Sequence, residues 1–560
     1  MGDVAGLWPG RCNHRQGRPR CPQGAARDAL ALLLVNQFLH IGRLDRPGEC
    51  GATHQVIRSE LVQAGIAQRP LMAGDVIPAL GIAVASIAFA PILQAANSAL
   101  AILVEALVGC AIILAAPAYA PSIAIFIIFF QNLFVSILSS YIATESEVEF
   151  VKGYNFLVCA VMWLVTLALY ALRERKHSPD IDRIMKWGLI TLATVTAYFV
   201  IGATQDSRAA LVYLRNIALP LFLFQLSLLT AATFEIRTTP FLVAVATLLI
   251  VCGYVELLFR DFWLSITNGY TFWHFDELKA TRSGAWEAQM RETGNVPVDL
   301  LDRFRFSFFN TPLLEDLGLS NLLRIFGPNM SPISFGYGIA FSILFLFAVG
   351  YRWLALAAIP LLIFCSVKGA LILAVFVALA WTSTWLLGPL ITLAGALIAL
   401  MLYAIVAIYV GMQIGDFHVI GFMGGWSGFL QNPIGRGLGV GGNLSEGYFS
   451  IDWNAAQQAG SIEGAVESAV GVLLYQMGIG SLVPLGFFLA MALKAWRLYA
   501  SSGILTQGLA AFGTMVVLVN GIFQEEALFA PPALGLLLCL TGLVIGHHLR
   551  TQGDGRKASD

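Results

Sequence analysis

Ionisable side chains lie within or beside several long apolar stretches of this 560-residue chain. Arg208 and Arg215 are seven residues apart, which places both on one face of a helix. Lys368 interrupts one apolar stretch, Glu467 begins another and Glu525 precedes the last. Arginine and lysine bind diphosphates, and a carboxylate can take the proton of an attacking hydroxyl. These residue types therefore predict a site that combines anion binding with general-base chemistry.

A purely structural role is the alternative for each of these residues. A charge that faces lipid costs roughly 3 kcal/mol or more, so each ionisable group needs a partner or a task. The three cations could pair with Asp206 or with either glutamate simply to hold helices together. The clustering of the whole set at one level of the membrane favours a site.

The composition is that of a membrane protein. Hydrophobic residues make up 58% of the chain and charged residues only 12%, and the mean hydropathy is +0.75. Soluble proteins carry about 25% charged residues, so the deficit is about twofold. The formal net charge of −1 gives no electrostatic reason to expect a nucleic-acid partner.

Fourteen long apolar runs follow residue 75 and predict an all-α, polytopic integral membrane protein with about 14 transmembrane helices. They cover approximately 76–96, 98–117, 121–142, 154–172, 186–203, 209–231, 239–259, 333–349, 352–366, 369–388, 390–411, 466–492, 504–523 and 530–549. Helices 1–7 fall in 76–259, helices 8–11 in 333–411 and helices 12–14 in 466–549, with long loops at 260–332 and 412–465. The 352–388 region fits either two short helices or one broken helix.

Lysine and arginine near the ends of the runs set the predicted orientation, because such residues mark the cytosolic side. They gather in the loop 173–186, at Lys494 and Arg497, and in the tail 550–560. The acidic segment 145–149 and both long loops then fall on the other side. The expected location is the bacterial inner membrane, with both termini cytosolic and the active face periplasmic.

Residues 1–75 are expected to form a cytosolic, poorly structured segment. Their one apolar patch, 29–34, is far shorter than a bilayer span. None of the eight cysteines lies in the two long loops, and the cysteines near the N-terminus lack the paired spacing of zinc sites. We therefore expect neither a disulfide framework nor a bound metal.

The two long loops differ in composition. The first carries aromatic residues that could stack on sugar rings or form an interfacial belt: Trp263, Tyr270, Phe272, Trp273 and Trp286. The second contains two glycine-dense runs, 421–426 and 432–443, which suit tight turns and anion capture by backbone amides. These runs are not a nucleotide P-loop, since the Lys-Ser/Thr pair and the following helix are absent.

Several motifs between residues 200 and 530 resemble the O-antigen ligase and polymerase superfamily, the Wzy and WaaL type membrane glycosyltransferases. In chain order they are Ser207-Arg208 with Leu214-Arg215-Asn216, the stretch from Arg324 to Gly336, Ser366-Val367-Lys368-Gly369-Ala370, the turn 432–439, and Glu467-Ser468 leading to Gly478-Ile479-Gly480. The resemblance rests on the order of these motifs and on the long loop that precedes Glu467.

The resemblance implies a GT-C-like enzyme that transfers a glycan from an undecaprenyl diphosphate donor to an acceptor sugar, without metal, cofactor or nucleotide. Its expected partners are the lipid-linked oligosaccharide, the growing polysaccharide chain, membrane lipid and other envelope polysaccharide assembly proteins. The residues implied in catalysis are Glu467 as the base with Arg215 and Lys368 at the diphosphate, and those implied in substrate binding are Arg208, Arg324, Arg436 and Glu525.

Two departures from the family pattern bear on the reaction. Lys368 stands where members commonly have arginine, which keeps the charge but not the bidentate fork. Glu467-Ser468 stands where ligases commonly have His-Asn, which favours an inverting polymerase of the exopolysaccharide or O-antigen type over a ligase.

Two classes other than a transferase remain as alternatives: a lipid-linked oligosaccharide flippase or other transporter, and a non-catalytic subunit of envelope assembly. The sequence has no clear internal repeat, and both long loops lie on one side, which is not typical of transporters.

Overall fold

The computed structural model of the protein describes residues 76–142, 144–172, 178–236, 238–282, 305–306, 322–445 and 451–557. The expectations for residues 1–75, for the basic residues 173–177 and for Trp286 concern positions outside these ranges. Helices and the turns between them make up the described residues, and the strands among them are a two-residue antiparallel pair, β1 (Arg305–Phe306) with β2 (Leu322–Leu323), in which Arg305 lies opposite Leu323.

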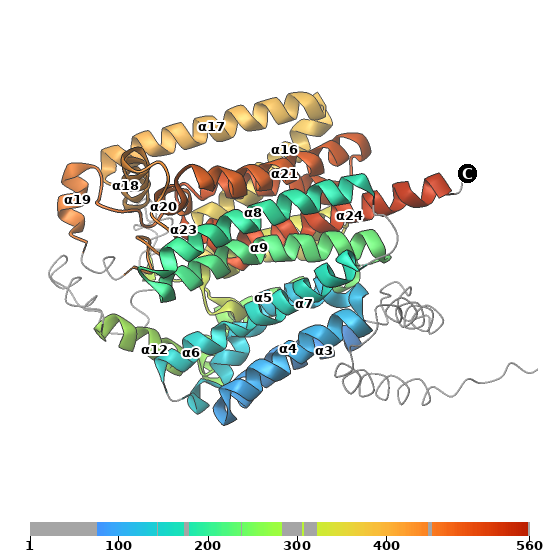
Figure 1. Ribbon diagram of the computed structural model, residues 1–560, viewed down its shortest axis with the longest axis horizontal. Helices are drawn as coiled ribbons and strands as arrows, with labels where there is room; N and C mark the ends of the chain where they lie inside the picture. The colour runs from blue at the N-terminus through green and yellow to red at the C-terminus, as the bar shows by residue number, and fades with distance from the viewer. Residues whose placement is uncertain are drawn as a thin grey trace, which may run out of the picture. The chain divides into compact units, whose positions relative to one another are not determined.

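Most of the helices run side by side (Figure 1). The first half contains α3 (Val76–Ala96), α4 (Ser98–Ala115), α5 (Ala120–Ile137), α6 (Glu145–Lys152), α7 (Tyr154–Ala171), α8 (Pro179–Ala203), α9 (Ser207–Thr233), α10 (Thr239–Leu258), α11 (Arg260–Ile266) and α12 (Gly269–Arg282). The second half contains α14 (Pro332–Ala348), α15 (Arg352–Cys365), α16 (Lys368–Leu387), α17 (Pro389–Ile414), α18 (Phe417–Gln431), α19 (Trp453–Ala459), α20 (Ala469–Met477), α21 (Leu482–Ser502), α22 (Leu505–Asn520), α23 (Glu525–Phe529) and α24 (Leu536–Lys557).

The protein is a polytopic membrane protein. Within the described ranges, 11 helical segments are long and apolar enough to cross a bilayer, and α14, α15 and α22 are shorter apolar helices. The 14 residues of α15 span about 21 Å, less than the roughly 30 Å of hydrocarbon. The predicted all-α, polytopic class is confirmed, but the count of 14 transmembrane helices is not.

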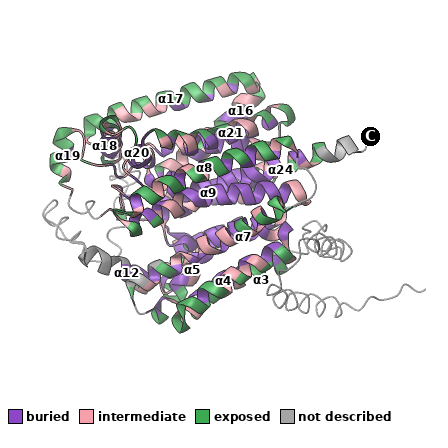
Figure 2. Cartoon of the chain, viewed as in Figure 1, coloured by how far each residue is buried: buried purple, intermediate pink, exposed green. Residues whose placement is uncertain are grey.

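The packed core lies around α9 and α24, whereas α17 lies at the edge of the bundle. Figure 2 shows α9 mostly buried and α17 largely exposed, as expected for a helix that faces lipid. Polar side chains join helices inside the core: Trp163 Nε1 donates to Gln225 Oε1 at 2.7 Å, and Ser227 Oγ lies 3.0 Å from Cys539 Sγ. Such bonds favour helix association where no water competes.

The 352–388 region forms two helices. Ser366, between α15 and α16, adopts a left-handed backbone with φ of 50°, which ends α15. The first turn of α16 then begins at Lys368. The corner packs closely on α14, since a Cβ on Gly336 would lie 2.9 Å from Val367 Cγ2.

A buried carboxylate holds the segment that leads into α14. Glu256, on α10, is fully buried and accepts hydrogen bonds from the amides of Phe326 at 2.9 Å and Gly327 at 2.7 Å. Asn329 Nδ2 donates to the carbonyl of Ile128 on α5, at 3.0 Å. The stretch from Arg324 to Gly336 is thus fastened to α5 and α10 through its own backbone and amide groups.

The aromatic residues of the first long loop do not form an open sugar-stacking face. Trp263, Phe272 and Trp273 are buried, and the Trp273 ring packs edge-on against Phe326 at a centroid distance of 4.4 Å. Tyr270 is exposed. The prediction of a stacking surface is wrong for the three buried rings, because α11 and α12 fold back and bury them.

The first glycine-dense run, 421–426, does not form the tight turns that its composition predicted. Residues 421–426 lie inside α18 and form no turn. Their glycines allow close helix packing, since a Cβ on Gly425 would lie 2.5 Å from the carbonyl oxygen of Gly471 on α20. Small residues at such contacts let two backbones approach. The run therefore positions α18 against α20.

We expect Gly425→Ala to lower stability by about 1 to 3 kcal/mol, because the new methyl group meets the backbone of α20. Gly395→Ala is the matched control, since Gly395 is also helical but has no atom within 4 Å of an added Cβ. Apparent Tm in detergent, followed by tryptophan fluorescence, should fall for Gly425→Ala and stay level or rise for the control. Equal values for the two variants would contradict the close α18–α20 contact.

Candidate functional site

The ends of α9, α18, α20 and α23 meet at one end of the bundle (Figure 1). α20 packs on both α18 and α23, and α23 packs on α9. The ion-pair and hydrogen-bonding groups of Glu467, His418, Asn443 and Glu525 gather where these ends meet. We call these four residues the Glu467 cluster.

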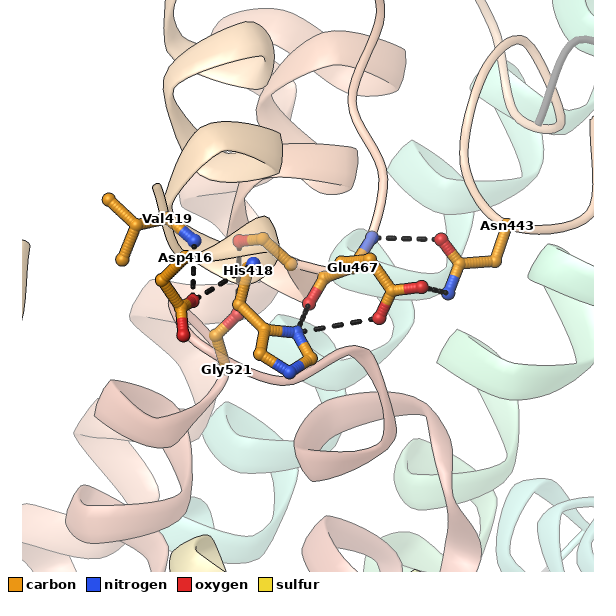
Figure 3. Close-up of polar contacts among 7 residues, drawn as sticks. Asp416, His418, Val419, Asn443, Glu467 and Gly521 are labelled. Carbon is orange, nitrogen blue, oxygen red and sulfur yellow. Dashed lines mark hydrogen bonds and ion pairs between the residues drawn. The ribbon is translucent and has the colours of Figure 1, made fainter. Parts of the chain in front are cut away.

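Glu467 is held in an uncommon backbone conformation. Its φ is 60°, a left-handed value that glycine adopts freely and glutamate rarely. Its amide donates to Asn443 Oδ1 at 2.8 Å, and Asn443 Nδ2 donates back to Oε1 at 3.3 Å. On the other side, His418 Nδ1 lies 3.1 Å from the Glu467 carbonyl oxygen and 3.4 Å from Oε2 (Figure 3). These contacts maintain the strained conformation.

A helix cap fixes His418. Asp416 is the N-cap of α18, and its Oδ1 accepts from the amides of His418 at 3.0 Å and Val419 at 3.2 Å (Figure 3). Asp and Asn are preferred caps because the first helical amides lack partners within the helix. The histidine side chain is 41% exposed and that of Glu467 is 21% exposed, so a ligand can reach both.

The start of α20 is joined to the turn after α22. Ser468 caps α20 by accepting from the Gly471 amide at 3.0 Å. The Val470 amide donates to the carbonyl of Gly521 at 2.9 Å. Since Glu525 lies only four residues beyond Gly521, this joint brings the two glutamates to the same region.

The second glycine-dense run, 432–443, packs on α9 and lies between Glu467 and Glu525. Gly442 lies directly on the hydroxyl of Tyr213, where an added Cβ would overlap the phenol oxygen. That hydroxyl donates to Glu525 Oε1 at 2.7 Å. Asn443, the next residue of the turn, holds Glu467. One turn thus touches both carboxylates.

The turn itself offers few amides to an anion. The amides of Arg436 and Gly437 both donate to the carbonyl of Gln476, at 3.0 and 2.9 Å. The amide of Leu438 donates to the carbonyl of Tyr198 at 3.0 Å. Gly442 donates to Ala465 at 2.7 Å. The prediction of anion capture is wrong for these four amides, because the fold already uses them.

Burial makes Glu525 a weak acid. The residue is buried, and its Oε2 makes no hydrogen bond with a described residue. Loss of water raises the pKa of its carboxyl to about 8, and the charges of Glu526 and Glu467 add to the effect. Burial likewise raises the pKa of Glu526. Of the three carboxyl groups Glu467, Glu525 and Glu526, that of Glu467 is the one that solvent reaches through a 21% exposed side chain.

The start of α16 lies beside this group, since a Cβ on Gly369 would lie 2.7 Å from Gln524 Oε1. Lys368 is exposed at the first position of this helix, where the helix dipole is also positive, so both charges attract an anion. The carbonyl of the next residue, Gly369, accepts from Asn520 at 2.9 Å, and Tyr337 on α14 donates to Gln524 Oε1 at 2.9 Å. These bonds tie the start of α16 to the residue that precedes Glu525.

Arg208 and Arg215 occupy the other face of α9. At about 100° per residue they lie about 20° apart, as predicted, but Tyr213 lies about 140° from Arg208 and about 160° from Arg215. Arg208 is exposed, and Arg215 is half-buried with its Nε donating to Asn216 at 3.3 Å. The helix therefore directs the two arginines away from the side on which it contacts Glu525.

Arg324 and Arg436 are engaged within the fold. Burial lowers the pKa of the Arg324 guanidinium, which lies near Cys365 at the end of α15. Arg436 donates to the carbonyl of Gly428 at 2.8 Å and stacks 4.1 Å above the Tyr475 ring. These contacts join α18 to α20 and stabilise the framework behind the Glu467 cluster.

Sequence reasoning identified Glu467 and Glu525 but missed His418, Asn443 and Tyr213. His418 follows an Asp416 cap immediately after a long apolar run, which is a recognisable helix start. Nothing in the sequence pairs His418 with a residue 49 positions later. Among the described residues, no group of three or more His, Cys, Asp or Glu side chains could hold a metal ion.

Comparisons with protein-family models, with curated proteins and with solved structures find no match to this chain.

We expect Glu467→Gly to be more stable than Glu467→Ala by about 1 kcal/mol, because only the backbone cost at positive φ separates the two variants. At exposed Glu463, whose φ is not positive, glycine should be no better than alanine. Apparent Tm of the four variants in detergent measures the difference. The same order at both positions would show that Glu467 is not strained.

We expect the protein to lose stability as pH rises from about 4, the ordinary carboxyl value, to about 8, where folded Glu525 ionises. In this window the folded state binds more protons than the unfolded state, so the unfolding free energy falls with pH. Glu525→Gln keeps an acceptor for Tyr213 and should flatten the slope of apparent Tm against pH. Glu463→Gln, on the surface, should not. An unchanged slope for Glu525→Gln would contradict the buried neutral carboxyl.

Proposed function

We propose that this chain is a polysaccharide polymerase that transfers undecaprenyl-diphosphate-linked glycan units to an acceptor sugar hydroxyl on the periplasmic face of the bacterial inner membrane. The observation that carries the proposal is the Glu467 cluster: an accessible carboxylate and imidazole beside buried acids, with the exposed cation Lys368 nearby. Glycan transfer from a lipid diphosphate needs these two features, a base for the hydroxyl and a cation for the leaving group.

The proposal divides the cations by position. Lys368, at the start of α16, meets the leaving diphosphate beside the carboxylates. Arg208 and Arg215 hold more distant parts of the lipid-linked donor along the exposed face of α9. Arg324 and Arg436 act through the framework. Buried Glu525 acts through Tyr213, whose hydroxyl donates to it. Glu467 supplies negative charge where the hydroxyl is activated. The left-handed φ of Glu467 supports a functional role, because strained residues are concentrated at active and binding sites.

A lipid-linked oligosaccharide flippase is the second candidate, and Glu105 is the observation that favours it. Glu105, inside α4, is fully buried, and neither carboxylate oxygen has a hydrogen-bond partner in the described part of the chain. Buried ionisable groups inside membrane helices mark proton relays and ion pathways in transporters. Glu105 is remote in sequence from every residue assigned to glycan transfer.

Cells that lack this protein provide the test, with polysaccharide chain length resolved by gel. We expect the intact chain to restore long polysaccharide, because it joins repeat units. Glu467→Gln and Lys368→Ala should instead accumulate single lipid-linked units on the periplasmic face, with at least tenfold less polymer, since each removes a charge that stabilises the transition state. Arg215→Ala should shorten chains less than Lys368→Ala, and Glu105→Gln should behave as the intact chain.

The side on which single units accumulate separates the candidates. Units trapped on the cytosolic face in the absence of the protein, together with loss of transport in Glu105→Gln, would establish the flippase and contradict the polymerase. Normal polymer in both Glu467→Gln and Lys368→Ala, with the proteins inserted at normal levels, would show that the proposed site is wrong.

A further inference from the structure

Both oxygens of the Glu467 carboxylate are already engaged. Oε1 accepts from Asn443 Nδ2 at 3.3 Å, and Oε2 lies 3.4 Å from His418 Nδ1. A base must present a lone pair to the hydroxyl at hydrogen-bonding distance. The Glu467 carboxylate contacts an amide on one side and an imidazole on the other. It is therefore better placed to orient Asn443 and His418 than to receive a substrate proton.

The neighbour that is free to act is the imidazole of His418. Its Nδ1 faces two acceptors, the carbonyl oxygen and Oε2 of Glu467, so the neutral ring carries its proton on Nδ1. Its lone pair is then on Nε2, which has no hydrogen-bond partner among the described residues. Figure 3 shows the ring edge that bears Nε2 directed away from Glu467. The side chain is 41% exposed, so this edge is open to a ligand.

We propose that His418 Nε2 is the general base of the proposed glycan transfer and that Glu467 and Asn443 are positioning residues for it. The assignment rests on the proposed function and refines it, since sequence reasoning gave the base to Glu467. The arrangement of nucleophile, imidazole and orienting carboxylate is one that unrelated folds use to activate hydroxyl groups.

The acceptor hydroxyl gives its proton to Nε2 as its oxygen forms a bond to the anomeric carbon of the donor glycan. The bond from that carbon to the diphosphate breaks, and its electron pair leaves with the lipid diphosphate beside Lys368. The imidazolium that forms is stabilised by the Glu467 carboxylate at Nδ1 and later releases its proton to water. The products are the lengthened glycan, the lipid diphosphate and one proton.

Chemical rescue tests this assignment in the full chain, reconstituted in proteoliposomes with a lipid-diphosphate-linked repeat unit. His418→Ala should slow glycan lengthening by about 100-fold or more, and added imidazole should restore at least tenfold. His418→Gln should be equally slow, since its amide can still bond to Glu467 but cannot take a proton. His274→Ala, which changes an exposed histidine on α12, is the control and should retain full activity without imidazole.

The outcomes separate the two levels of the proposal. If His418→Ala and His418→Gln lengthen glycan within threefold of the intact chain, or if imidazole has no effect on His418→Ala, the histidine is not the base and the proposed function stands. If the intact chain itself lengthens no glycan, both the proposed function and the assignment of His418 are overturned. Rescue of His418→Ala by imidazole supports both.

Discussion

The left-handed backbone of Glu467 is the constraint on which the candidate site depends. A glutamate at φ of 60° costs about 1 kcal/mol or more relative to glycine, and it persists only where neighbours fix it. Asn443 binds both its amide and its carboxylate, and His418 meets its carbonyl and its other carboxylate oxygen. If this residue relaxed, the start of α18 and the glycine-rich turn would each lose a contact with the residue that leads into α20. The strain is therefore matched by contacts from two separate segments, the glycine-rich turn and the start of α18.

The burial of two carboxyl groups sets the chemistry around this point. Glu525 is buried and Glu526 is half-buried among the helices, and loss of solvation favours the neutral form of both carboxyl groups. Tyr213 shares its hydroxyl with Glu525, and the turn that holds Glu467 lies directly on that tyrosine. A charge at Glu467 is thus felt by the acids behind it. Glu467 and His418 are therefore the groups of this region that a ligand from solvent meets first.

Hydropathy predicted the helices well because lipid imposes the same requirement on every span. The runs 76–96 and 154–172, for example, coincide with α3 and α7 to within a residue. Composition failed at the ends of the helices, where burial depends on tertiary packing. The glycine run 421–426 is helical because α20 lies against it, and Trp273 is buried because α12 folds onto Phe326. Neither contact can be read from local sequence.

The sequence likewise predicted only those features of the candidate site that depend on local spacing and charge. The seven-residue spacing of Arg208 and Arg215 gives their common face on α9, but not which neighbour that face meets. Glu467 was identified from charge at a helix start, whereas His418 and Asn443 depend on contacts across 49 and 24 positions. Glu105 was overlooked inside its apolar run, although its charge in a span is itself a signal.

The most direct measurement of the central claim is the product stoichiometry of the purified full chain in proteoliposomes that contain only a lipid-diphosphate-linked repeat unit. We expect glycans of two or more units to appear, with one lipid diphosphate released for each glycosidic bond formed, without added metal or nucleotide. Intact single units that only redistribute between the two leaflets, with no lipid diphosphate released, would contradict glycan transfer and identify the protein as a carrier.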